Sequence, residues 1–249
     1  MTNERLAVSS ADASELEPEA LEEIIRRRAL SLVAEIGRDE AAVRLGLLAK
    51  VGTRYAPTMV GLYALGRVPQ HHFPEWGVGC VAIAGTNLVD PIEAQADLEG
   101  GAASLAAGAL AFVRERCGGV LSGESAYDET TLRESLVNAL VHRDLRRPSR
   151  VAVRVFTDRV EVWSPGGPPE GVGDLEELGR EGGISQPRNP LLASIMRQLG
   201  HGEQIGRGLA LMLQSPQAPL ERRVEVRASA RDVLVVLPSR WQRPQAALS

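Results

Sequence analysis

Hydrophobic and polar residues recur with a helical period over Thr131–Asp144. At about 100° per residue, the leucine and valine side chains share one arc of this helix, whereas Glu134, Asn138 and His142 form a polar stripe beside it. Asn is a poor helix former because its amide competes for nearby backbone groups, so Asn138 needs either exposure or a partner such as a ligand. An ordinary amphipathic helix with a solvated polar edge is the alternative interpretation.

Two β-rich runs follow this helix, Arg150–Phe156 and Arg159–Trp163, and they predict an antiparallel hairpin. The second strand leads into a Ser-Pro-Gly-Gly turn at residues 164–167, where glycine lets the backbone approach a flat ligand closely. A plain turn after a strand is the alternative. The glycine-rich connection over residues 168–187 is typical of a disordered segment or a functional lid. Asn189 is expected to cap the next helix.

The N-terminal half predicts a mainly helical region. Residues 1–17 are polar, acidic and small, which is typical of a disordered tail. Helices are expected from Pro18, over Asp39–Lys50, and after a Thr58 cap. The last two, with a short strand between them, look like the latter half of a winged-helix module, serving as a packing or dimer element. A strand over Gly77–Gly85 and a long alanine-rich helix over Pro91–Arg116 are then predicted.

Composition restricts the function classes. The chain has 249 residues and a net charge of -4, which argues against broad nucleic-acid binding but leaves a local DNA contact open. Cys80 and Cys117 are far apart and lack partners at metal-binding spacing, so neither a zinc site nor a disulfide framework is expected. With no signal peptide or membrane span in the sequence, a reducing cytoplasm is the expected location.

The order of three blocks indicates a family. Glu134-x-x-x-Asn138, the glycine turn after Trp163 and the Gly206-Arg207-Gly208 string resemble the N box and the two glycine boxes of the gyrase, histidine kinase and MutL ATPase superfamily. The blocks ESLVNALVHRD, VRVFTDRVEVWSPGGPPEGV, RNPLLASIMRQLG and EQIGRGL are similar to the C-terminal part of RecG-related proteins described as transcriptional regulators. That similarity extends from about Ala56 to Pro238. A Schlafen/AlbA-like DNA-binding domain usually precedes this part in the family, and none is expected here.

The resemblance implies an ATP and Mg²⁺ site. Asn138 would supply one side-chain oxygen to the ion, which otherwise keeps waters and phosphate oxygens. Glu134, one turn earlier on the same face, would orient or deprotonate the attacking water. His142 and Asp144 match the family's HRD block without an assigned chemical role, and a salt bridge from Asp144 to a nearby arginine is the structural alternative.

The resemblance also places the glycine boxes around the nucleotide. Gly166 and Gly167 would flank the adenine, and the phosphates would meet residues of the second box, namely Gly206, Arg207 and Gly208. The superfamily uses an Asp to accept the adenine amino hydrogen, whereas this chain has Ser164 at the nearest position. A hydroxyl accepts this bond more weakly, which lowers the expected adenine specificity. A glycine-rich helix entry with no ligand is the alternative for the second box.

The sequence therefore predicts an α+β fold, a two-layer α/β sandwich of the histidine-kinase-like ATPase type with a helical N-terminal part. Its expected divisions are a winged-helix-like and connecting region over 18–122, an ATPase domain over 123–240, and a tail over 241–249. A homodimer is expected from apolar side chains of the N-terminal helices, namely Ile24, Ile25, Leu30 and Leu32.

Two functions of different class follow from these predictions. The first is a nucleotide-binding regulator with slow ATP hydrolysis. The second is a non-catalytic scaffold or interaction module that keeps the ATPase-like fold and is linked to DNA or transcription. A third hypothesis, DNA binding by a winged helix over residues 20–66, ranks last because it depends on an arginine triplet at residues 26–28 and on family resemblance.

Overall fold

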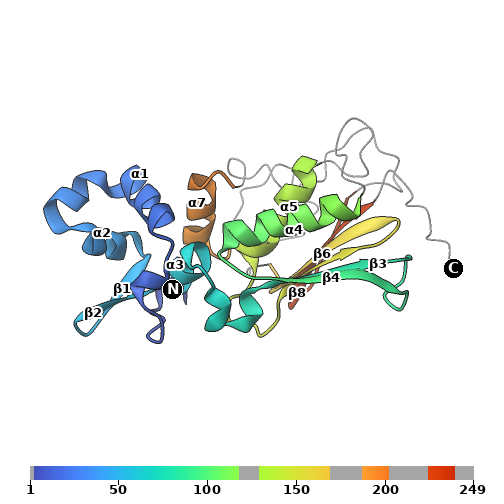
Figure 1. Ribbon diagram of the computed structural model, residues 1–249, viewed down its shortest axis with the longest axis horizontal. Helices are drawn as coiled ribbons and strands as arrows, with labels where there is room; N and C mark the ends of the chain where they lie inside the picture. Colours follow the sequence, from blue (N-terminus) through green and yellow to red (C-terminus); the bar gives the residue numbers. More distant parts are fainter. Residues whose placement is uncertain (1–2, 118–128, 169–186, 202–223, 239–249) are drawn as a thin grey trace.

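The computed structural model describes residues 3–117, 129–168, 187–201 and 224–238. It has the predicted α+β architecture: a helical N-terminal part is joined to a sandwich of helices on a sheet (Figure 1). The α-helices are α1 Pro18–Ile36, α2 Arg38–Leu45, α3 Met59–Leu65, α4 Ala102–Arg116, α5 Glu129–His142 and α7 Pro190–Gln198. Among the described helices, none is long and apolar enough to cross a membrane.

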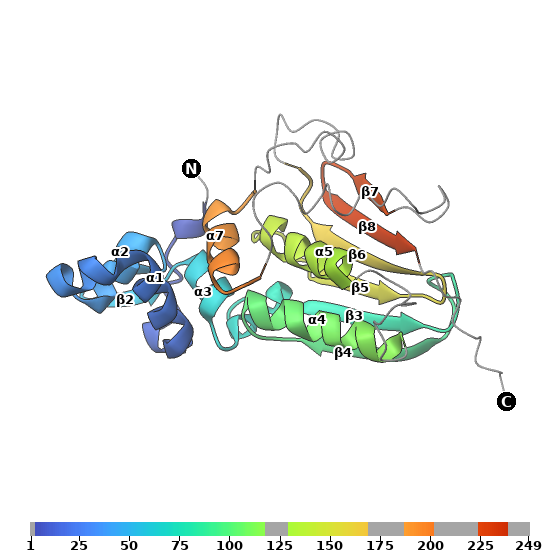
Figure 2. The same cartoon turned by 90° about the horizontal axis from the view of Figure 1, so that it is seen from above.

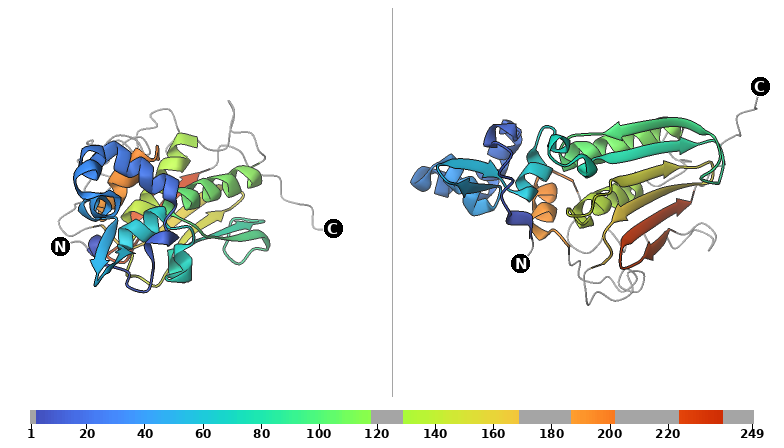
Figure 3. Two further views of the ribbon diagram at one scale, coloured as in Figure 1. Left: turned by 60° about the vertical axis from the view of Figure 1, so that its left-hand side comes forward. Right: turned by 90° about the horizontal axis from the view of Figure 1, so that it is seen from below.

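A six-stranded sheet forms one layer of the sandwich, with the order β4-β3-β5-β6-β8-β7. Its strands are β3 Val78–Ile83, β4 Ile92–Leu98, β5 Val151–Val155, β6 Arg159–Pro165, β7 Glu225–Ala228 and β8 Asp232–Pro238. The β3–β5 pair is parallel and the other pairs are antiparallel, so the sheet is mixed and mainly antiparallel. Figures 2 and 3 show α4 and α5 on one face of this sheet and no described helix on the other.

Strand alternation and helix period converge on the core between these layers. Val151, Val153 and Val155 of β5 are buried, and the residues between them are half-buried. Successive side chains of a strand point to opposite faces, so these valines share the helix-facing side of the sheet. The leucines of α5 are at most 2% exposed. Each fully buried side chain of this size contributes roughly 1.5–3 kcal/mol, so α5 is fixed mainly by its apolar arc.

The N-terminal part is built from α1, α2, the hairpin of β1 Leu48–Val51 and β2 Arg54–Pro57, and α3. The Thr58 side chain caps α3 as predicted, because its oxygen accepts the backbone N–H of Gly61 at 3.0 Å. Every residue of α3 after Met59 is buried. The helix contacts both α4 and α7, and it therefore joins the N-terminal part to the sandwich.

The long helix predicted over Pro91–Arg116 is wrong in its first part. Ile92–Leu98 forms the edge strand β4, in which polar and apolar residues alternate, and it pairs with β3 through a register that includes Val78↔Leu98. Gly100 has a φ of 117°, a conformation that side-chain-bearing residues rarely adopt, and α4 begins just after it. A strand and a helix separated by a glycine turn were therefore merged into one helical pattern.

The helix predicted over Asp39–Lys50 is too long for a similar reason. It ends at Leu45, because Gly46 takes the left-handed conformation of a helix C-cap. The chain then turns into β1, where Leu48 pairs with Pro57. The apolar run Leu45–Leu48 supplies core residues to a turn and a strand as well as to the helix end.

The prediction of a disordered tail over residues 1–17 is wrong for the described residues 3–17. This segment runs along α3: the Val8 N–H donates to the Pro57 carbonyl at 2.8 Å, and the Glu17 N–H donates to the Leu65 carbonyl at 2.7 Å. Leu16 is 1% exposed. The segment has too few apolar residues to form a core of its own, but these side chains complete a core that other elements supply.

Two of the four side chains expected to form a dimer interface are buried inside the chain. Ile24 and Ile25 are 0% and 4% exposed, so they belong to the core of the chain. Leu32 is half-buried, whereas Leu30 is 65% exposed. One exposed leucine on α1 is ordinary for a monomer surface. A dimer therefore stays a prediction.

Glu4 should make stability depend on pH. Its side chain is 4% exposed; Oε2 accepts the Leu191 N–H at 3.1 Å, and Oε1 has no hydrogen-bond partner. Burial raises the pKa of this carboxyl, only partly offset by the Leu191 hydrogen bond and Arg5, so protonation stabilises the folded chain at low pH. As the pH rises through this raised pKa, that contribution is lost. A Glu4→Gln variant should exceed the wild type by on the order of 1 kcal/mol at pH 8.

Thermal melting between pH 4 and pH 8 measures this difference, and it should shrink as the pH falls. Glu99→Gln, at an exposed position, serves as the matched control and should show no such trend. A Glu4→Gln variant less stable than the wild type at pH 8 would mean that the charge is favourable at the start of α7.

Candidate functional site

The polar stripe of α5 is graded in exposure. Glu134 is 5% exposed, whereas Asn138 and His142 are half-buried. Glu134 makes contacts within the protein, but the Asn138 amide has no hydrogen-bond partner among the described residues. The described residues thus leave the Asn138 amide uncommitted, and its contact with a ligand stays a prediction.

His142 lies at the last turn of α5 as an uncharged side chain. Burial and, to a smaller extent, the nearby Arg188 guanidinium lower the pKa of its imidazole to about 4. The ring is therefore neutral near pH 7. It can donate a hydrogen bond through one nitrogen and accept one through the other, depending on its tautomer.

Ser164 is fixed at the interface between the helices and the sheet. It is 4% exposed, and its hydroxyl donates to the Ala139 carbonyl of α5 at 2.7 Å. The hydroxyl hydrogen of Ser164 is therefore used in a hydrogen bond that joins β6 to α5. This link brings the end of β6, and the glycine turn after it, next to the polar stripe.

The glycine turn contacts Asp144 and the β7–β8 turn. Gly166 has a φ of 105°, and a Cβ added there would lie 2.8 Å from the Cβ of Asp144. A Cβ at Gly167 would lie 2.0 Å from the Ser229 carbonyl oxygen. Both positions require glycine, because no side chain fits the approach of these backbone segments.

Asp144 anchors the turn and gathers arginines. Its N–H donates to the Pro165 carbonyl at 2.7 Å. Its carboxylate pairs with Arg146 at 3.1 Å and lies 3.9 Å from Arg147 and 3.8 Å from Arg188, which confirms the structural alternative for this residue. Burial alone would raise the pKa of Asp144, but the Arg146 hydrogen bonds and the charges of Arg146 and Arg188 lower it overall, so the group is ionised at neutral pH.

The sequence did not predict the long-range contacts of two residues beside the site, Arg188 and Asn189. The Arg188 guanidinium donates to the Gly167 carbonyl. Asn189 occupies the N-cap position of α7, but its side chain makes no cap hydrogen bond. Instead, its amide donates to the carbonyls of Val141 and Arg143 at 2.8 and 2.9 Å, which closes the C-terminal end of α5. Sequence distance hid this contact, because an Asn before Pro at a helix start reads as a local cap.

Arg143, the central residue of the HRD block, has a structural role in the core. It is 0% exposed, and its guanidinium donates to the carbonyls of Glu75 and Ser149, each at 3.0 Å. The guanidinium carbon of Arg143, Cζ, also lies 5.6 Å from the centroid of the Tyr63 ring. Because it faces the core and not the stripe, Arg143 supports the site without lining it.

The polar side chains of the candidate site fit a loosely held Mg²⁺ ion better than a closed metal centre. In the described part of the chain, no group of three or more His, Cys, Asp or Glu side chains could hold a metal. A Mg²⁺ ion that keeps its waters and binds phosphates needs few protein ligands, and the Asn138 amide, which bonds to no other described residue, would supply one oxygen. Gly206, Arg207 and Gly208 lie outside the described residues, as do the predicted lid over most of 168–187 and the tail over 241–249.

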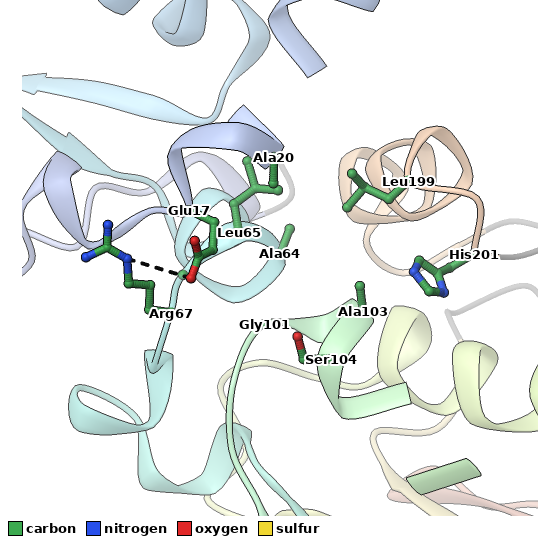
Figure 4. Close-up of a pocket in the computed structure, with 11 residues that line it drawn as sticks. Glu17, Ala20, Ala64, Leu65, Arg67, Gly101, Ala103, Ser104, Leu199 and His201 are labelled. Atoms are coloured by element: carbon green, nitrogen blue, oxygen red, sulfur yellow. Dashed lines mark ion pairs between the residues drawn. The ribbon is translucent and has the colours of Figure 1, made fainter. Parts of the chain in front are cut away.

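A separate hollow of about 230 Å³ lies at the junction of α1, α3, α4 and α7 (Figure 4). It contains no residue of the stripe or of the glycine turn. Glu17 and Arg67 form an ion pair of 3.7 Å at one side, and His201 lies across from it. Its walls are mainly small apolar side chains, and its polar groups are satisfied or exposed.

Comparison with known proteins identifies the domain that carries the glycine turn. Residues 149–237 match the family described as "Putative ATP-dependent DNA helicase recG C-terminal". This stretch, from β5 into β8, is therefore similar to the ATPase-like region of the RecG C-terminal type. The match begins after α5, so Glu134 and Asn138 lie outside it.

The fold is shared with the DIP2311 protein from Corynebacterium diphtheriae, whose crystal structure matches with a TM-score of 0.66 and 19% identity. The alignment covers 97% of this chain and 41% of that one, so the chain spans less than half the length of this structural relative. No curated protein matches the sequence.

Loss of the Asn189 amide should destabilise the fold. In an Asn189→Ala variant, two buried carbonyls at the end of α5 lose their donor, which should lower the free energy of unfolding by about 2–3 kcal/mol. Urea unfolding of the wild type and the variant measures this difference in the free energy of unfolding. Asn87→Ala, at an exposed position, is the matched control and should stay within about 0.5 kcal/mol of the wild type. An equally small loss for Asn189→Ala would show that water replaces the amide.

Proposed function

We propose that the chain is an ATP-binding regulatory protein that hydrolyses ATP slowly. The observation that carries this proposal is the half-buried Asn138 amide, which has no hydrogen bond to another described residue and lies on a helix joined to the glycine turn of an ATPase-like region. The stripe supplies polar groups, and the glycine turn belongs to the stretch that matches the ATPase-like family. The Ser164–Ala139 hydrogen bond joins that stretch to the helix that carries the stripe, which supports a nucleotide site at this helix.

Asn138 would hold Mg²⁺ through its side-chain oxygen. When bound, this ion would offset the negative charge of the phosphates, because Asn138 and the neutral His142 carry no positive charge of their own. The neutral imidazole of His142 adds no charge beside it. The stripe therefore favours a nucleotide that arrives with its metal over a free polyphosphate.

Glu134 would orient the attacking water or take its proton. It lies one helical turn before Asn138, on the same face of α5. A general base must come within hydrogen-bond reach of the water, and a carboxylate that is 5% exposed offers little room for it. This burial supports slow turnover, which suits a regulatory switch better than a metabolic enzyme.

The second candidate function is a scaffold linked to DNA or transcription, in which the ATPase-like fold is kept without nucleotide. One observation favours it: the Ser164 hydroxyl, at the position that would meet the base, donates to Ala139 inside the protein. Regulation of transcription and homodimer formation belong to either candidate. Nucleotide binding separates the two.

Calorimetric titration with ATP and Mg²⁺ tests the first candidate. The wild type should bind saturably, and Asn138→Ala should weaken binding by roughly tenfold, because a ligand of the ion is lost. Gln95→Ala, at an exposed position of β4, is the matched control and should bind like the wild type.

Absence of binding at millimolar ATP by the folded wild type would contradict the proposal and favour the scaffold. Equal affinity of the wild type and Asn138→Ala would place the ion elsewhere. Omission of Mg²⁺ should weaken ATP binding to the wild type and have little further effect on Asn138→Ala.

A further inference from the structure

We infer that the outer edge of β4 binds an extended basic segment of a partner protein, which adds to the sheet as a further strand. The segment carries lysine or arginine at alternate positions and small apolar residues between them. In strand addition, main-chain hydrogen bonds give affinity and alternate side chains give specificity. This inference does not depend on the proposed function, because β4 contains no residue of the polar stripe or of the glycine turn.

β4 lies at the end of the six-stranded sheet and has an open edge. It pairs with β3 on one side, and no described strand pairs with it on the other (Figure 2). Every second residue of an edge strand directs its N–H and C=O groups away from the sheet. The register shift of this pair lies between Ala82 and Ile83 of β3, so the pairing is regular from Ala94 to Leu98. This stretch is therefore a regular template for hydrogen bonds with another chain.

The two sides of β4 differ in polarity. Glu93, Gln95 and Asp97 are exposed, whereas the residues between and after them are half-buried. Leu98 lies under α4, where a Cβ added to Gly108 would be 3.3 Å from its Cδ1. An added strand would continue this alternation, with small apolar side chains beside α4 and polar side chains on the sheet face that no described helix covers.

The charge around β4 is acidic. The chain has no lysine or arginine between Arg67 and Arg114. The acids in β4 or within two residues of it are Asp90, Glu93, Asp97 and Glu99. Arg150, just before β5, pairs with Asp97 at 2.8 Å, but 75% of the Asp97 side chain stays exposed. Opposite charges on neighbouring strands stabilise their pairing, so this edge favours a basic strand.

The same charges oppose a second copy of the chain at this edge. Two β4 strands related by a two-fold axis would pair antiparallel. An axis at Gln95 would place Glu93 opposite the second copy's Asp97, and an axis at Ala96 would place Glu93 opposite the second copy's Glu99. Like charges directly opposite each other are destabilising. The acids thus select against self-pairing and leave the edge open to a strand of the other sign.

The remaining edge of the sheet lacks this selectivity. β7 carries Glu225 and Arg227, which form an ion pair with each other, so its local charge is balanced. The turn before β4 adds a second difference, because Leu88, Val89 and Ile92 are 64%, 93% and 60% exposed. An apolar residue at one end of the added segment would contact them and fix its direction along β4.

The test uses a short fluorescent peptide of alternating lysine and valine. Anisotropy titration with the full chain should show saturable binding. The same peptide with glutamate in place of lysine should bind on the order of tenfold more weakly. A lysine–valine peptide methylated at every backbone nitrogen keeps its charge but has no N–H donors, and it should be weakened on the order of tenfold as well.

The chain supplies its own matched controls. A Glu93→Gln/Asp97→Asn double variant should bind the lysine–valine peptide roughly fivefold more weakly than the wild type. Glu225→Gln, at an exposed position of β7, should bind like the wild type. On addition of the peptide, amide hydrogen exchange should slow in Ile92–Leu98 and stay unchanged in Glu225–Ala228.

Each contrary outcome would overturn the inference. Absence of saturable binding at millimolar peptide would remove the surface, and equal affinity for the methylated peptide would show attraction by charge without strand addition. Unchanged exchange in β4 would place the contact elsewhere. A dimer that protects β4 without peptide would assign the edge to a second copy. None of these results involves ATP, so the proposed function is tested separately, and the wild-type titrations decide the inference even if the double variant does not fold.

Discussion

The last carbonyl groups of α5 lie in the protein interior and need donors that the helix itself cannot supply. Asn189 provides two of these donors from the start of α7. The fully buried Arg143, next along the chain, binds carbonyls of two further loops. An unsatisfied buried carbonyl costs about 1–3 kcal/mol, so these contacts fix where α7, the glycine turn and the N-terminal part lie around the helix end. The polar stripe is positioned by the same end.

This arrangement connects the candidate site to segments that are distant in the sequence. The start of α7 contacts Gly167 through Arg188 on one side and receives the Glu4 carboxylate on the other. The indole N–H of Trp76 donates to the Leu145 carbonyl, just beyond the HRD block. The glycine turn therefore belongs to a packed junction that also carries the N-terminal part. Packed junctions of this kind transmit displacement, because their contacts cannot deform continuously.

Elements with a strong local signal were predictable from the sequence: α5 from its apolar arc, the β5–β6 hairpin from its β-rich runs, and α3 from its Thr58 cap. The sequence predictions were wrong where contacts with another element determine the conformation of a segment. Residues 3–17 have the composition of a tail, but they order because α3 offers them backbone partners. Ile92–Leu98 is rich in alanine and adopts the strand conformation because β3 presents an edge to pair with.

The candidate site divides in the same way. Glu134 and Asn138 are four residues apart on one helix, so their shared face follows from helical geometry alone. Asp144 and Gly166 are separated by a whole hairpin, and only the register of β5 and β6 brings the helix end to the turn. The superfamily has an Asp at the end of this strand, and Ser164 is a weaker hydrogen-bond acceptor. From the sequence alone, adenine binding is therefore less strongly predicted. In the folded chain the same serine secures the strand to α5, and Asp144 packs against the glycine turn from the end of that helix.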